Sequence, residues 1–277
     1  MKTLPRQLYD TFGRRGRSWR AIAKLVAMPS IRLLSRARLR LPVEQARPEY
    51  VMWLEMLLGQ YERHTARACR QLLRPGMIVA DVGAHVGYFS LLFADCVGES
   101  GHVYAFEPHP YNRCLLQLNT ARRTNITVVG KAVADRSAEV PFFASSIGSG
   151  SHSLREDRVA AHARAVVHAI TLDEFFDGMR LDFVKIDVEG AEELVLAGAE
   201  RLLNSAKPPA LLLEVCPQLA TASGGEVPSL TLLRHKGYCL TIIDDTAGRV
   251  EPLDTPDGIV AALQAVKKYA NVLAVRR

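Results

Sequence analysis

A glycine-containing turn between an apolar strand and a helix is the feature that most constrains the fold of this chain. Residues 79–91 read Val-Ala-Asp-Val-Gly-Ala-His-Val-Gly-Tyr-Phe-Ser-Leu, and helical spacing resumes from Tyr88. Gly83 and Gly87 allow the backbone to turn sharply and to come close to a ligand, because glycine has no Cβ. A strand, a glycine turn and a helix in this order predict the first unit of an α/β nucleotide-binding fold.

An acidic residue follows at the spacing that such a site requires. Glu107 lies about 20 residues beyond Gly87, at the end of a second predicted strand over 102–106. A βαβ nucleotide site places there the carboxylate that accepts hydrogen bonds from ribose hydroxyls. An ordinary βα turn with two glycines is the alternative, and Glu107 in register argues against it.

The turn favours one class of cofactor over another. A dinucleotide fingerprint reads Gly-x-Gly-x-x-Gly, whereas this chain has Asp-x-Gly-x-x-x-Gly, with His85 inside the turn. The acidic Asp81 at the strand end would repel a pyrophosphate, but it suits the cationic amino group of a methionyl tail. The turn therefore predicts S-adenosylmethionine rather than NAD.

Charge is distributed unevenly along the 277 residues. Residues 1–40 contain eleven lysines and arginines and a single acid, Asp10, although the whole chain carries only +6. The remainder is therefore net acidic and gives no reason to expect nucleic-acid binding. Residues 14–40 mix arginines with apolar residues, which allows contact with an anionic membrane surface; a solvated basic arm, or helices docked on the body, is the alternative. Residues 42–48 resemble a linker, so we expect an N-terminal extension over 1–48 and a domain over 49–277.

Cysteine usage and hydropathy indicate a cytoplasmic location. The five cysteines are scattered and form no Cys-x-x-Cys pair, which favours reduced thiols. No run is long and apolar enough to cross a bilayer, and the first ten residues lack the apolar core of a secretory signal. The arginine-rich, acid-poor start does resemble an organelle transit peptide, so that alternative stays open. If the basic arm binds lipid, the inner membrane surface is the expected place.

Strands and helices are predicted to alternate after residue 76, which indicates a parallel sheet with helices on both faces. Strands are predicted over 77–81, 102–106, 126–133, 139–144, 166–170, 181–186, 209–215, 238–243 and 271–275. Helices are predicted over 50–73, 88–94, 111–123, 191–203 and 230–235, with a short one opened by the capping box at 171–174 and a weaker one over 258–268. The Ser/Gly-rich loop 145–153 is long enough to be a lid.

Several blocks of this sequence resemble the FkbM family of S-adenosylmethionine-dependent methyltransferases. The similarity runs from about Tyr61 to about Glu214, and its matching blocks are 81–90, Phe106-Glu107-Pro108, 130–133, Thr171-Leu172-Asp173, the most specific block 184–192 and, more weakly, Tyr61-Glu62. The resemblance implies a Rossmann-like class I methyltransferase: a three-layer α/β sandwich whose seven-stranded sheet is mostly parallel with an antiparallel edge strand. It also implies O-methylation of sugars and natural products. His85 departs from the family, which more often has Asn at this position.

The expected cofactor site combines the turn with two residues further along the chain. By resemblance, Lys131 and Ala132 lie where a class I fold closes over adenine. The full predicted set is Asp81, Gly83, Ala84, His85, Gly87, Tyr88, Glu107, Pro108, Lys131 and Ala132. Asn119 either forms a hydrogen bond near the cofactor or ends its helix.

Three acids are expected at the carboxyl ends of neighbouring strands, where open α/β sheets bind their ligands. Asp187 and Glu189 follow one strand, and Glu214 ends the next. One of them could be the general base for a hydroxyl acceptor, or Asp187 and Glu214 could hold Mg²⁺ or Mn²⁺. Metal use is a hypothesis.

Other residues offer rival or supporting roles. His152 in the loop is a rival base, because the ordinary pKa of histidine lies near neutrality; a solvated loop histidine is the alternative. Lys185 either orients a carboxylate or pairs with Asp187 for stability. Glu192 and Glu193 are expected to complement a helix dipole.

The sequence thus predicts a cytoplasmic S-adenosylmethionine-dependent methyltransferase that methylates a hydroxyl of a sugar, glycolipid or secondary metabolite. Methylation of nitrogen or of a carboxyl group is the enzymatic alternative. A cofactor-binding regulatory or scaffold protein without turnover is the other, but the acids at 187, 189 and 214 argue against it. Oligomeric state is not predicted.

Overall fold

The computed structural model describes residues 39, 50–145, 152–159, 162–216, 227–266 and 269–276. The helices are α3 (Tyr50–Leu57), α4 (Arg63–Leu72), α5 (Tyr88–Val97), α6 (Pro110–Thr120), the short 3₁₀ helix η2 (Glu156–Arg158), α7 (Leu172–Phe175), α8 (Glu192–Ala197), α9 (Glu200–Leu203), α11 (Pro228–His235) and α12 (Pro256–Gln264). The strands are β1 (Ile78–Val82), β2 (His102–Phe106), β3 (Ile126–Val129), β4 (Ala132–Val133), β5 (Glu139–Ser145), β6 (His162–Ile170), β7 (Phe183–Ile186), β8 (Ala210–Val215), β9 (Tyr238–Asp244), β10 (Arg249–Pro252) and β11 (Ala270–Arg276).

The main sheet has the strand order β10-β9-β11-β8-β7-β1-β2-β3. Strands β8, β7, β1, β2 and β3 are parallel, and β11 is antiparallel to both of its neighbours, β8 and β9. This is the predicted class I, Rossmann-like arrangement. It has eight strands rather than seven, because β10 forms a hairpin with β9 and adds an antiparallel edge. The short, largely polar segment 249–252 offers no pattern from which that strand could be predicted.

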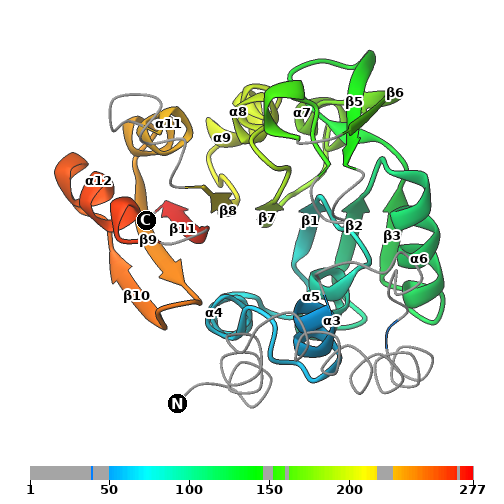
Figure 1. Cartoon of the computed structure of the whole chain (residues 1–277), viewed down its shortest axis with the longest axis horizontal. Helices are drawn as coiled ribbons and strands as arrows, with labels where there is room; N and C mark the ends of the chain where they lie inside the picture. The colour runs from blue at the N-terminus through cyan, green and yellow to red at the C-terminus, as the bar shows by residue number, and fades with distance from the viewer. Residues whose placement is uncertain are drawn as a thin grey trace, which may run out of the picture.

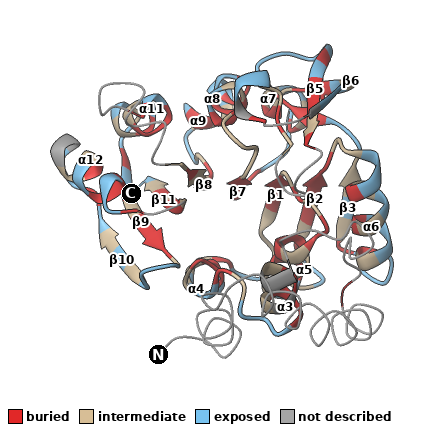
Figure 2. Cartoon of the chain, in the orientation of Figure 1, coloured by how far each residue is buried: buried red, intermediate tan, exposed pale blue. Residues whose placement is uncertain are grey.

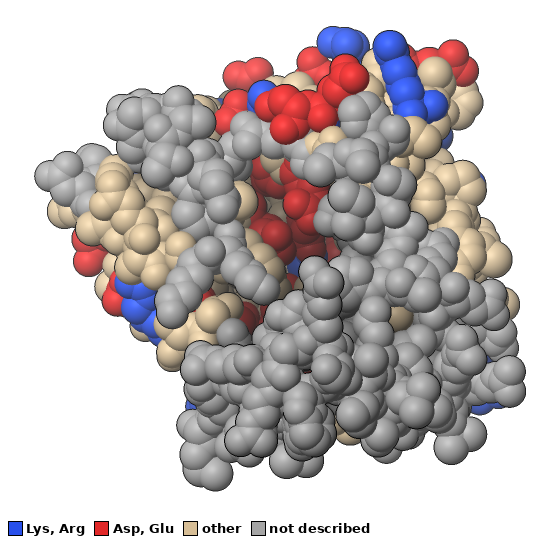
Figure 3. Space-filling view, viewed as in Figure 1, with Lys and Arg blue, Asp and Glu red and all other residues tan. Residues whose placement is uncertain are grey.

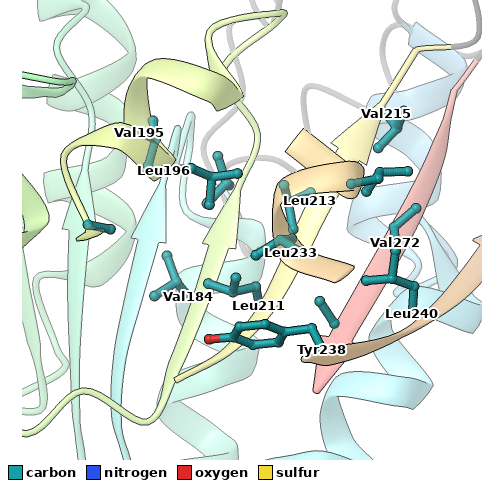
Figure 4. Packing of buried hydrophobic residues seen from close by; sticks show 14 of the residues in the cluster. Val184, Val195, Leu196, Leu211, Leu213, Val215, Leu233, Tyr238, Leu240 and Val272 are labelled. Carbon is teal, nitrogen blue, oxygen red and sulfur yellow. The ribbon is translucent and has the colours of Figure 1, made fainter. Parts of the chain in front are cut away.

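Helices cover both faces of the main sheet, which gives three layers (Figure 1). Val79, Phe183 and Leu212 pack with residues of α4 and α5 on one face. Their neighbours Val184, Leu211 and Leu213 pack against residues of α8 and α11 on the other. Figure 4 shows this second core, and Figure 2 shows that burial concentrates along the central strands. Each such side chain contributes about 1.5–3 kcal/mol when fully buried, so the central strands hold the layers together.

Two long predicted helices are each broken by a local backbone constraint. The helix predicted over 50–73 is divided into α3 and α4, because Gly59 and Glu62 adopt positive φ values of 66° and 42°. The helix predicted over 191–203 is divided into α8 and α9 around Gly198. A Cβ at Gly198 would lie 2.0 Å from the carbonyl oxygen of Ala134, so the chain must pass close to another segment there.

A second sheet with the order β4-β6-β5 extends from the main one. The strand predicted over 126–133 is two strands, because the chain leaves β3 at Gly130 and joins the second sheet as β4. The predicted lid falls mostly outside the described residues, at 146–151. Its far end is anchored, since Phe143 and Ser153 exchange backbone hydrogen bonds of 2.8 and 3.1 Å.

The N-terminal extension lies outside the described residues except for Leu39, which is buried with Trp53, Met56 and Leu57. The boundary near residue 48 and the membrane contact of residues 14–40 therefore stay predictions. Within the described part of the chain, no helix combines the length and the hydropathy needed to span a bilayer. All five cysteines are free thiols.

Candidate active site

A row of polar side chains crosses one face of the main sheet near the carboxyl ends of its parallel strands. Asp81 of β1 lies beside Lys185 of β7, and Glu214 of β8 lies beside Asn271 of β11. Because side chains alternate along a strand, these residues share the face that packs on α4 and α5. The row is polar, whereas the rest of this face of the sheet packs as an apolar core.

Lys185 is the cation at the centre of this row. Its Nζ donates to Oδ2 of Asp187 at 2.7 Å and lies 4.9 Å from the ring centroid of Phe89, and its side chain is only 3% exposed. Burial alone lowers the pKa of Lys185, but the carboxylates of Asp187, Asp81 and Glu62 outweigh burial and raise it. Lys185 therefore stays charged, and the pairing with Asp187 that the sequence suggested is present.

The carboxyl groups around Lys185 outnumber it. Burial, together with the nearby Asp187 and Glu192, raises the pKa of Glu189 to about 8. Burial and the charges of Asp187 and Glu62 raise the pKa of Glu214 well above its usual value. Figure 3 shows acidic side chains lining a hollow in the middle of one face. The site thus has more carboxyl groups than cations, and a bound cation or hydrogen-bond donors would favour their charged forms.

The two glycines of the turn are required by the packing of the protein itself. Gly83 has φ +83°, and a Cβ there would lie 1.9 Å from the carbonyl oxygen of Asp187. Gly87 has φ +89°, and a Cβ there would lie 2.6 Å from Cδ1 of Leu116. The sequence interpretation assigned these glycines to ligand approach; in the structure they also let β1 meet the loop after β7 and let α5 meet α6.

Glu107 is held in place by the turn. Its Oε2 accepts the backbone N–H of His85 and its Oε1 accepts that of His109, both at 2.9 Å. Burial raises the pKa of Glu107 to about 8, although both hydrogen bonds favour its charged form. Each carboxylate oxygen can accept a second hydrogen bond. The carboxylate is therefore oriented while retaining capacity for two hydroxyl donors.

His85 has a backbone explanation. Its φ of +52° directs its N–H to Glu107, and Asn and His are among the non-glycine residues that tolerate this left-handed region. Because both residues tolerate this conformation, His can occupy position 85, where the FkbM family more often has Asn. Burial lowers the pKa of His85 to about 4, so its ring is neutral at physiological pH.

Backbone strain concentrates in this part of the molecule. Among the described residues, the non-glycine residues with positive φ are Glu62, His85 and Glu189. Such conformations cost on the order of 1–3 kcal/mol each and cluster at functional sites. Glu189 is followed by Gly190, also at positive φ, and Ser153 donates to the carbonyl oxygen of Glu189 at 2.9 Å.

Glu62 was not among the site residues predicted from the sequence. It is 6% exposed, and its Oε2 accepts from Nδ2 of Asn271 at 2.9 Å. The same amide donates to Oγ1 of Thr65 at 3.1 Å, and Thr65 Oγ1 donates to Asp245 at 2.6 Å. The sequence offered two signals, an Asn inside an apolar strand and the weak match of Tyr61-Glu62 to the family. Neither signal reveals that residue 62 and residue 271 are in contact.

His152 lies on the Glu107 side of the site. Its Nδ1 accepts the backbone N–H of Ser145 at 2.9 Å, and its ring centroid lies 4.2 Å from that of His109 and 5.9 Å from that of Phe142. The structure therefore packs His152 between β5 and the segment after Glu107. Its neighbour Ser153 connects this region to Glu189.

The remaining predicted residues are placed as follows. Ala84 and Ala132 are buried, and Lys131 is exposed. The Tyr88 hydroxyl donates to the carbonyl oxygen of Tyr61 at 3.2 Å, and the carbonyl oxygen of Pro108 accepts from Arg113 at 2.8 Å. Asn119 donates from α6 to the carbonyl oxygen of Val86 in the turn at 2.7 Å, and Glu192 accepts the N–H of the nearby Gly190 at 2.9 Å.

The metal hypothesis gains no donor set. In the part of the chain that the structure describes, no three His, Cys, Asp or Glu side chains are arranged to hold a metal ion. Asp187, one of the two predicted ligands, already pairs with the ammonium of Lys185. We therefore assign no step to a metal.

The residues present do fit S-adenosylmethionine. An oriented carboxylate, that of Glu107, directly follows β2. A surplus of acids around Lys185 suits a ligand with a positively charged sulfur and amino group. The turn after β1 contacts both regions, through the N–H of His85 to Glu107 and through the packing of Gly83 on the carbonyl oxygen of Asp187.

A family model and a curated protein match parts of this sequence. The methyltransferase FkbM domain model matches residues 81–240. A protein-L-isoaspartate O-methyltransferase of Methanothrix thermoacetophila is 32% identical over 87 residues, which is 30% of this chain and 41% of that protein. The chain thus spans less than half the length of this curated relative.

Two methyltransferases are among the solved structures that the chain matches, both with TM-scores below 0.5. Methyltransferase FkbM from Methylobacillus flagellatus is 16% identical, with a TM-score of 0.47, over 92% of this chain and 60% of that one. An S-adenosylmethionine-dependent O-methyltransferase from Thermotoga maritima is 14% identical, with a TM-score of 0.45, over 78% of this chain and 66% of that one. Because the domain model covers more than half of the sequence, the chain belongs to the FkbM methyltransferase family.

Proposed function

We propose that the protein is an S-adenosylmethionine-dependent O-methyltransferase that acts on a neutral hydroxyl of a sugar, glycolipid or secondary metabolite. The observation that carries the proposal is the excess of carboxyl groups around Lys185, whose ammonium is already paired with Asp187. An acceptor with a carboxylate or phosphate would add negative charge to this buried cluster and be repelled. A neutral hydroxyl avoids that repulsion and can donate its proton to a carboxylate.

In this proposal, the residues of the turn hold the cofactor. Glu107 accepts hydrogen bonds from the ribose hydroxyls, Asp81 and the backbone from Gly83 to Tyr88 surround the methionyl part, and Lys131 and Ala132 border adenine. When bound, S-adenosylmethionine supplies an electrophilic methyl group on a positively charged sulfur. The carboxyl groups of this chain favour that charge through space.

The acceptor is proposed to lie over the ends of β7 and β8, between Asp187, Glu189 and Glu214. Lys185 fixes Asp187 in position, because its ammonium donates to Asp187 at 2.7 Å and lies against the ring of Phe89. Holding the acceptor oxygen in line with the transferred methyl group accelerates the reaction by removing orientational freedom. His152 packs on the Glu107 side, so we give it no catalytic role.

Methyl transfer to matched acceptors tests the proposal. The assay follows label from methyl-labelled S-adenosylmethionine into a neutral polyol or phenol and into its amino and carboxyl analogues. We expect a methyl ether from the neutral member of each set. Transfer to only the carboxyl or only the amino analogue would show that the acceptor class is wrong, and no transfer to any acceptor would support the cofactor-binding protein without turnover.

We also propose that residues 14–40 hold the enzyme at the anionic inner surface of a membrane. The support is the contrast between eleven basic residues in the first 40 and the net acidic remainder. A membrane-bound glycolipid or lipophilic acceptor would then be presented near the site.

A further inference from the structure

Glu62 enters the active-site cluster from the helix layer rather than from the sheet. It stands immediately before α4 in the left-handed conformation, with φ 42° and ψ 52°. Its carboxyl group lies close enough to Lys185 and Asp187 for their charges to shift its pKa. Tyr269 and Glu214 are affected by the charge of Glu62 in turn, so the side chain lies among residues of β7, β8 and the start of β11.

One oxygen of Glu62 is held and the other is not. Oε2 accepts from Asn271, whose amide also reaches Thr65, while Asp245 accepts the N–H groups of His64 and Thr65 at the start of α4. Oε1 is buried and accepts no hydrogen bond of normal geometry, although the Tyr61 hydroxyl is near enough to favour the charged carboxylate. Native proteins rarely leave a buried acceptor unpaired, so Oε1 points to a donor supplied by a ligand.

Asp187 is less suited than Glu62 to remove a proton. Its Oδ2 already accepts from the ammonium of Lys185 at 2.7 Å, so this oxygen is occupied by a partner within the protein. Glu62 is bonded to a neutral amide, and burial raises its pKa to about 7. A general base is most effective when its pKa lies near the working pH.

On the basis of the proposed function, we propose that Oε1 of Glu62 accepts the proton of the acceptor hydroxyl. The hydroxyl O–H bond breaks, its proton passes to Glu62, and the acceptor oxygen uses the freed electron pair to form the new bond to the methyl carbon. The electrons of the broken carbon–sulfur bond stay on sulfur as a neutral thioether. Glu62, now neutral, returns its proton to solvent. Asn271 is a positioning residue that fixes Oε2 and so aims Oε1.

Three variants of the full chain test this assignment. In E62Q the amide cannot take a proton, and we expect kcat to fall by about 10²- to 10⁴-fold while the Kd of S-adenosylmethionine, measured by calorimetry, changes by less than about threefold. N271L should lower kcat less and move the acid limb of the pH–rate profile upward, because the charged carboxylate loses a donor. The matched control is E99Q, since Glu99 is exposed on the turn after α5; it should behave as the wild type.

A measurement on the ligand-free protein is independent of turnover. With ¹³C-carboxyl-labelled glutamate, one resonance of the wild type and of E99Q should titrate near pH 7 and be absent from E62Q. The groups that face Glu62 and also shape this titration are Lys185, Asp187, Asp245, Tyr61, Tyr269 and Glu214. Replacing any of these would move the resonance, but only E62Q should remove it.

The outcomes separate this inference from the proposed function. E62Q with wild-type kcat would overturn the role of Glu62 and leave O-methylation standing. A loss of S-adenosylmethionine affinity of more than about tenfold in E62Q would instead assign Glu62 to the cofactor and also overturn it. Failure of the wild type to methylate any hydroxyl would contradict the proposed function itself.

Discussion

Substitution of Gly83 by alanine should destabilise the fold far more than substitution of a glycine with the same backbone strain and open surroundings. Gly83 and Gly178 both have positive φ, +83° and +70°, which costs an alanine about 1–2 kcal/mol. At Gly178 a Cβ meets nothing within 4 Å, whereas at Gly83 it would lie 1.9 Å from the carbonyl oxygen of Asp187. Forcing β1 away from the loop after β7 adds overpacking of about 1–3 kcal/mol. We therefore expect about 2–5 kcal/mol for G83A and about 1–2 kcal/mol for G178A.

Urea unfolding of both variants, with thermal unfolding in parallel, measures this difference. For a chain of this size each kcal/mol lowers Tm by about 2–4 °C, so G83A should melt clearly below G178A. The same displacement moves Asp187, so G83A should also lower turnover, while G178A should keep it. Equal destabilisation of the two variants would refute the argument that the Asp187 carbonyl, rather than ligand approach alone, requires glycine at this position.

Three further predictions concern charge. D187N should keep S-adenosylmethionine binding but lower turnover, because Asp187 lies beside the proposed acceptor position. Its loss of stability should be smaller than the roughly 3–5 kcal/mol of a fully orphaned buried ion, because Asp81 and Glu62 still face Lys185. A fully active D187N would exclude a role for Asp187. The ligand-free protein should lose stability as pH rises from about 4.5 to about 8, because folding raises the pKa of Glu107 and Glu189 to about 8. E189Q should reduce the change of Tm with pH, and a wild-type Tm independent of pH over that range would contradict the prediction. The full chain should sediment with anionic vesicles and not with neutral ones. Replacing Arg14, Arg15 and Arg17 by Glu should weaken the free energy of vesicle binding by on the order of 1 kcal/mol per residue. Equal binding to both kinds of vesicle would refute an electrostatic role for residues 14–40.

Most of the fold was predictable because its signals are local. The apolar runs of β1, β7 and β8 are buried on both faces of the sheet. Such runs can be predicted as strands from their own residues, without knowledge of the neighbouring strands. The errors arose where a distant segment decides the backbone, as at Gly198, which must pass the carbonyl of Ala134. The hairpin strand β10 was missed because its four residues carry no periodic pattern of their own.

The site was predictable only in part, for a related reason. Glu107 and Asp187 follow strands whose ends must lie together in any parallel sheet, so spacing alone brings them to one edge. Glu62 reaches the same cluster only because Asn271, more than 200 positions later in the chain, bonds to it across the sheet. No local pattern encodes that contact, and the antiparallel insertion of β11 between β8 and β9 creates it.

Calorimetric titration of S-adenosylmethionine into the wild type and into E107A tests the central claim most directly. Ribose hydroxyls that donate to Glu107 favour its charged form, and hydrogen bonds to a charged carboxylate contribute about 1.5–3 kcal/mol. E107A should therefore bind S-adenosylmethionine about 10- to 100-fold more weakly than the wild type. Thermal unfolding should confirm that both proteins are folded. A wild type that does not bind S-adenosylmethionine, or an E107A variant that binds it equally well, would contradict the cofactor site described above.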